Sequence, residues 1–166
     1  MKKPYLSITS QSIQRSRRNA NICRGERDKM QENYHQLLRE LNLKEENAFK
    51  YIENCLTRNF PDFKIRLHPK IKLGTGHSWT GNYLGKRLIW IKKDQPESER
   101  VKSLFHELLH FHPKINLVYE LNGIKDIQET QEGIIENLAQ ETYRKRSDLV
   151  RMASDKINKL EVEVRE

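Results

Sequence analysis

The sequence predicts an α+β fold in which helices pack on a small, mostly antiparallel sheet. Two observations carry this prediction. Apolar residues recur at helical spacing between residues 26 and 56 and again from residue 97 onward, whereas apolar and polar residues alternate between residues 63 and 91. With 166 residues, the chain is long enough for one domain whose core needs no disulfide.

Two helices are expected before the strands. Helical spacing of apolar residues between residues 30 and 41 indicates the first. The second is indicated by one apolar face, and Asn59 to Pro61 should end it. That face comprises Ala48, Phe49, Ile52, Cys55 and Leu56.

The strands should follow directly. Phe63, Ile65 and Leu67 alternate with charged residues, which is typical of a strand, and residues 87–91 form the clearest later strand. Glycines between residues 74 and 85 mark a turn-rich segment between them.

Three further helices are predicted after residue 93. Asp94 is expected to cap the first of them, which should end near His112 because Pro113 cannot continue it. Asp126 with Glu129 resembles a capping box and opens a helix to about residue 144. The charged segment 147–166 should be another helix.

The charge distribution divides the chain into three parts. Residues 1–24 form a basic N-terminal arm or pro-segment, residues 25–144 the domain, and residues 145–166 a charged C-terminal helix. The net charge of +8 comes mainly from the arm. Such an arm is consistent with nucleic-acid binding or with a solvated tail.

His106-Glu107-Leu108-Leu109-His110 is the most informative segment, with the pattern H-E-x-x-H. Residues four apart share one face of a helix, so the two imidazoles can chelate one Zn²⁺. Glu107 is then placed to act as general base towards a metal-activated water. The apolar residues of this helix gather on the opposite face, so the core and the metal need not compete. They are Val101, Leu104, Phe105 and Leu108.

A third ligand is expected on the next helix, because catalytic zinc usually takes three protein ligands. Glu132 and Glu136 lie one turn apart on one face. One carboxylate can bind the metal while the other accepts an N–H from a ligating histidine. Gly133 is expected to let the two helices approach closely. His112 lies on the apolar side of the motif helix, which is typical of a packed or capping residue.

The combination of H-E-x-x-H with a later helical E-x-x-x-D/E resembles the gluzincin class of zinc metallopeptidases, in particular the minigluzincins and the ImmA/IrrE-type proteins. The resemblance covers roughly residues 26–144, and its specific part is confined to the two motifs. It implies a small zincin-like domain with a backing helix, a small sheet, an active-site helix and a glutamate helix. It also implies that Glu132 is the third zinc ligand and that Glu136 supports a ligating histidine. Because the chain has Glu rather than Asp at position 136, Glu136 is also an alternative ligand.

The activity that this resemblance implies is zinc-dependent hydrolysis of peptide bonds in a peptide or protein substrate. One zinc ion would be held by His106, His110 and Glu132, with Glu107 as general base. An extended substrate would pair with the segment 74–90. Candidate donors to the oxyanion are Tyr143, Tyr119 and His77.

The sequence leaves the regulation of this activity and two alternative functions open. Minigluzincins occur as latent forms blocked by a terminal segment, for which the basic arm and residues 147–166 are candidates. Cys23 is either a ligand for the open metal position or a free thiol. The alternatives are a DNA-associated protease of the SprT/Spartan type and a non-enzymatic zinc-binding regulatory protein. With no apolar segment of membrane-spanning length and no secretory signal, a cytoplasmic location is expected.

Overall fold

The computed structural model describes residues 32–58, 63–68, 78–83, 86–121, 124 and 126–165. Residues 38–166 belong to one compact unit, and residues 32–37 are the described part of another. The expectations for the arm, for Cys23 and for His77 fall outside the described residues.

The two helices expected before the sheet are present. Residues 32–40 are helical. α2 spans Glu45–Thr57, with Glu45 and Glu46 in its first turn, where carboxylates interact favourably with the helix dipole. The predicted apolar face of α2 is confirmed, because all of its members are buried. They are Ala48, Phe49, Ile52, Cys55 and Leu56.

Three strands form one sheet in the order β1-β3-β2. β1 spans Phe63–His68, β2 spans Ser78–Tyr83 and β3 spans Lys86–Lys92. β3 is central, antiparallel to β2 but parallel to β1. The expectation of a mostly antiparallel sheet was therefore wrong for these strands. The short connection between β2 and β3 produces an antiparallel pair. The chain reverses direction between β1 and β2 and again between β2 and β3, so β1 and β3 run parallel.

The motif helix α3 spans Glu97–Leu109 and is shorter than expected at both ends. Its N-cap is Pro96 and not Asp94, because the residue before a proline is disfavoured in helical conformation and the helix cannot extend back through Gln95. At the other end, the amides of Phe111 and His112 bond to carbonyls three residues back, which closes the helix in a tighter turn.

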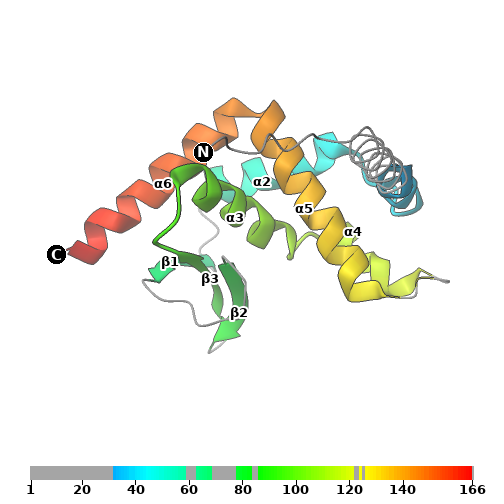
Figure 1. Ribbon diagram of the computed structural model, residues 1–166, viewed down its shortest axis with the longest axis horizontal. Coiled ribbons are helices and arrows are strands. Elements are labelled where there is room, and N and C mark those ends of the chain that lie inside the picture. Colours follow the sequence, from blue (N-terminus) through cyan, green and yellow to red (C-terminus); the bar gives the residue numbers. More distant parts are fainter. Residues whose placement is uncertain are drawn as a thin grey trace, which may run out of the picture. The chain divides into compact units, whose positions relative to one another are not determined.

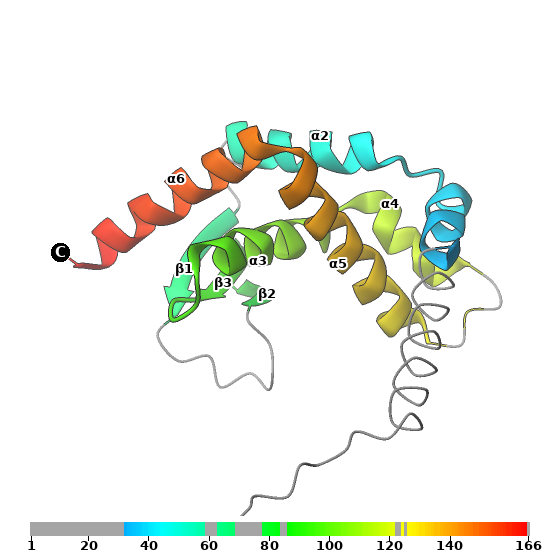
Figure 2. The ribbon, with the colours of Figure 1, turned by 45° about the horizontal axis from the view of Figure 1, so that its top comes forward.

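α3 is the central helix of the unit. It contacts β2 and β3 on one side and α2, α5 and α6 elsewhere, so that it lies between the sheet and the other helices (Figure 1, Figure 2). The predicted apolar face is confirmed: four of its residues are at most 2% exposed. They are Val101, Leu104, Phe105 and Leu108.

The helices after α3 complete the unit. α4 spans Pro113–Asn116 and is followed by the 3₁₀ helix η1, Leu117–Glu120. α5 spans Ile127–Lys145, and the Asp126 side chain caps it by accepting the Glu129 N–H at 2.9 Å, as predicted. α6 spans Ser147–Arg165.

α6 is part of the core. Its residues Leu149, Ala153 and Ile157 are fully buried, and it contacts α2, α3, α5 and β1. The C-terminal stretch expected as a separate helix therefore packs within the compact unit. None of the helices in the described part of the chain has both the length and the apolar character needed to cross a bilayer.

Gly133 does not bring α3 and α5 together. It is exposed on α5, and a Cβ at this position would meet no atom within 4 Å. Its carbonyl accepts a hydrogen bond from the Asn137 side chain, one turn on. The glycine thus costs helix stability without a packing gain.

We expect Gly133→Ala to raise the free energy of unfolding by about 1 kcal/mol, because alanine restricts the unfolded chain and fits the helix without a clash. Urea denaturation of the metal-free protein measures the change. A destabilised variant would show that Gly133 makes a close contact that a Cβ disrupts.

Candidate metal centre

Two imidazoles and one carboxylate converge where α3 meets α5. His106 Nε2 and His110 Nε2 lie 3.2 Å apart. Glu132 Oε2 lies 3.0 Å from His106 Nε2, and Glu132 Oε1 lies 3.2 Å from His110 Nε2. His110 is the C-cap of α3 but keeps right-handed helical dihedrals, so its side chain remains one turn from His106.

These separations fit the donor set of a tetrahedral zinc site. With metal–ligand bonds of about 2.0–2.1 Å, two ligand atoms of a tetrahedral site lie about 3.3–3.4 Å apart. The observed distances of 3.0–3.2 Å are close to this separation. Imidazole nitrogen and carboxylate oxygen are ordinary zinc ligands.

Glu107 belongs to the same cluster. One of its carboxylate oxygens lies within 4.8 Å of a ring nitrogen of both His106 and His110, and these three residues could hold a metal ion. Although helical periodicity placed Glu107 towards the metal face, its exposure is only 4%. The Glu107 carboxylate is therefore largely shielded from solvent.

Glu136 orients His106 from the other side of the ring. His106 Nδ1 donates to Glu136 Oε2 at 3.1 Å, so the proton on this nitrogen leaves the Nε2 lone pair free to face His110 and Glu132. This hydrogen bond is the main reason why the pKa of Glu136 falls to about 2. Glu136 thus contacts Nδ1 of His106, whereas Glu132 contacts the Nε2 atoms of both histidines.

The two imidazoles differ in proton affinity. Burial acts to lower the pKa of His106, but the hydrogen bond to Glu136 and the nearby carboxylates outweigh it and raise that pKa above its ordinary value. Burial lowers the pKa of His110, and the adjacent His106 lowers it further. A proton therefore binds His106 more readily than His110, and metal binding to these nitrogens would compete with it.

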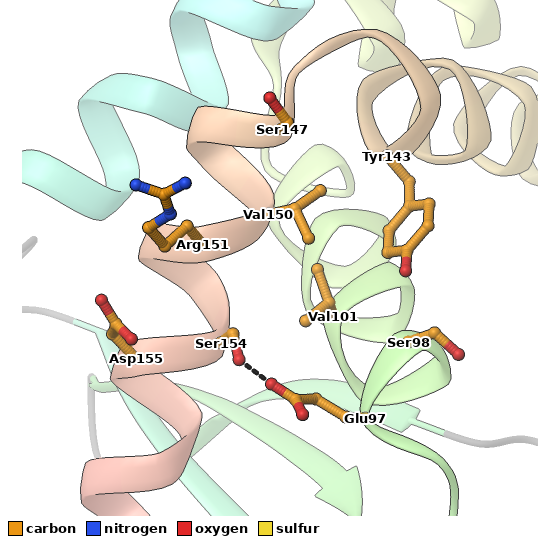
Figure 3. Close-up of a pocket in the computed structure, with 9 residues that line it drawn as sticks. All are labelled: Glu97, Ser98, Val101, Tyr143, Ser147, Val150, Arg151, Ser154 and Asp155. Atoms are coloured by element: carbon orange, nitrogen blue, oxygen red, sulfur yellow. Dashed lines mark hydrogen bonds between the residues drawn. The ribbon is translucent and has the colours of Figure 1, made fainter.

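The candidate oxyanion donors lie in different places. Tyr143 points into a pocket of about 390 Å³ near the start of α3, which Glu97 and Ser98 also line (Figure 3). Its ring lies under Lys102 Nζ, 5.0 Å from the ring centre. The Tyr119 hydroxyl donates to Gln131.

His112 is a capping residue, as expected. It is buried, its Nδ1 accepts the Lys114 N–H at 3.2 Å at the start of α4, and its ring packs edge-on against Tyr51. Burial and the charge of Lys114 lower the pKa of His112 to about 4.

The lowered pKa of His112 predicts acid-sensitive stability. Between pH 6.5 and 4, His112 binds a proton in the unfolded chain but not in the folded chain. The contribution of neutral His112 to the free energy of unfolding is therefore complete above pH 6.5 and is lost as the pH falls to 4. It amounts to up to about 3 kcal/mol. His112→Asn, which keeps a capping acceptor but cannot titrate, should gain stability relative to wild type over this range in chelator-containing urea denaturation. A difference between the two proteins that is constant with pH would contradict the assignment.

Two residues near Glu136 were not predicted from the sequence. Gln140 Nε2 donates to Glu136 Oε1 at 2.9 Å, and the charge of Lys102 contributes to the low pKa of Glu136. The signal for Gln140 was available, since it lies one helical turn after Glu136. Lys102 lies on another helix, so no spacing could indicate it.

Comparison of the chain with protein families, with characterised proteins and with solved structures finds no match. The site therefore stands on its own geometry.

Proposed function

We propose that the chain is a zinc-dependent peptidase in which His106, His110 and Glu132 hold the metal ion and Glu107 is the general base. The observation that carries the proposal is the set of 3.0–3.2 Å separations among the two Nε2 atoms and the Glu132 oxygens, beside a buried glutamate. The gluzincin-like pairing of the two motifs supports the same assignment.

The chemistry divides between the metal and Glu107. A bound zinc ion would lower the pKa of a coordinated water towards neutrality and polarise the substrate carbonyl. Glu107 is held within 4.8 Å of both imidazoles and is shielded from solvent. Its carboxylate can take the proton of the attacking water and deliver it to the leaving amine. His106 and His110 contribute as neutral imidazoles, and Glu136 fixes the tautomer of His106.

The sheet offers a place for an extended peptide substrate. β2 is an edge strand, paired with β3 on one side and with no other described strand on its second side. It also contacts α3, the helix that carries the histidines. An extended chain can add to such an edge through main-chain hydrogen bonds. This supports a peptide as the substrate class.

We expect Glu107→Gln to bind about one zinc per chain but to lose peptide cleavage by at least about 100-fold, because the amide cannot accept the proton. Zinc content by atomic emission and cleavage of a mixed peptide library measure the two effects. Glu99→Gln, an exposed position on α3, is the matched control.

Two results would contradict the mechanism. If Glu107→Gln cleaves as fast as wild type, Glu107 is not the base. A wild-type protein that binds one zinc but cleaves no peptide would instead favour a non-enzymatic metal site.

We expect Glu132→Ala to weaken zinc binding more than Glu136→Ala does. The first change removes a ligand, whereas the second removes a hydrogen-bond partner and should cost about 10- to 100-fold in affinity. Competition with a zinc chelator measures both, with Glu129→Ala as an exposed control on α5. The reverse order would transfer the ligand role to Glu136.

A further inference from the structure

The Glu136 carboxylate is held from two directions. Its Oε2 accepts the Nδ1–H of His106 at 3.1 Å, and its Oε1 accepts a hydrogen bond from Gln140 Nε2 at 2.9 Å. The two hydrogen bonds engage different oxygens of one carboxylate, so together they restrain its position. Gln140 is therefore linked to the candidate metal centre through one intermediate residue.

Glu136 needs such a hold. Its side chain is 58% exposed, so packing does little to fix its three rotatable bonds. It lies one helical turn from Glu132 on the same face of α5. A glutamate with this freedom can swing towards a metal ion and compete as a ligand. Gln140 lies one turn beyond Glu136, on the side away from Glu132, and so restrains the carboxylate in the opposite direction.

We propose that Gln140 is a positioning residue for the metal centre: it holds Glu136 on His106 Nδ1 and keeps Glu136 from binding the metal. This inference rests on the proposed zinc site. The hydrogen bond from Gln140 engages the oxygen of Glu136 that His106 leaves free, so a swing of the carboxylate towards the metal would break a hydrogen bond at each oxygen. The side chain of Glu136 is longer than that of an aspartate at the same position, so its carboxylate has more freedom that Gln140 must restrain.

Lys102 is the other candidate for holding the Glu136 carboxylate in place. Its charge acts on Glu136, but its Nζ donates to Glu99 at 3.0 Å and lies over the Tyr143 ring. Lys102 thus supplies a diffuse attraction, whereas Gln140 supplies a directed hydrogen bond. Lys102→Met separates the two, because it should leave the position of Glu136 unchanged.

The test compares zinc affinity and the visible spectrum of the Co²⁺-substituted protein. Gln140→Leu removes the donor and should weaken zinc binding about 3- to 10-fold, less than loss of Glu136 itself. The Co²⁺ absorption should also weaken, because entry of Glu136 raises the coordination number above four. Gln140→Lys, whose ammonium can donate to the same oxygen, should restore both properties. Gln128→Leu on α5 is the exposed control.

A double-mutant cycle identifies the route of the effect. If Gln140 acts through Glu136, Gln140→Leu should have no further effect in a Glu136→Ala background. An equal effect in both backgrounds overturns the proposal, as does a Gln140→Leu protein with wild-type zinc affinity and an unchanged Co²⁺ spectrum. A wild-type chain that binds neither metal overturns the zinc site itself, and this outcome is distinct from a binding chain that is insensitive to Gln140.

Discussion

The enclosure of α3 is the constraint on which the rest of the structure depends. Leu104, Phe105 and Leu109 have no solvent exposure, and α3 contacts both the sheet and the surrounding helices. Burying each of these side chains contributes about 1.5–3 kcal/mol, which outweighs the cost of partly burying two imidazoles beside hydrogen-bond partners. Apolar packing therefore sets the orientation of α3. His106 and His110 lie on the face of α3 that is turned towards α5.

The balance of charge around His106 and His110 explains why the cluster could hold a metal ion. Glu107, Glu132 and Glu136 lie around two imidazoles, and three carboxylates in so small a volume repel one another unless positive charge separates them. The hydrogen bond to Glu136 and the nearby carboxylates favour the protonated form of His106 and raise its pKa despite burial. A divalent ion would supply positive charge among the same groups and would accept their lone pairs.

Local patterns were sufficient for much of the fold. The apolar face of α2, the cap at Asp126 and the strand around Ile89 follow from spacing and side-chain chemistry over a few residues. The predicted start of α3 at Asp94 was wrong. Pro96 disfavours helical dihedrals at Gln95, and this restriction outweighs the capping preference of Asp94. The parallel pairing of β1 with β3 was not predictable, because it depends on how the chain returns to the sheet.

The sequence by itself determined what a single helix determines: that His106 and His110 face the same way, and that Glu132, Glu136 and Gln140 lie one turn apart along α5. The crossing of α3 and α5 decided how the carboxylates of α5 lie against the histidines of α3. It places Glu132 against both Nε2 atoms and Glu136 against Nδ1. The crossing of two helices depends on the shapes of both packed faces, which the periodicity of either sequence segment does not contain.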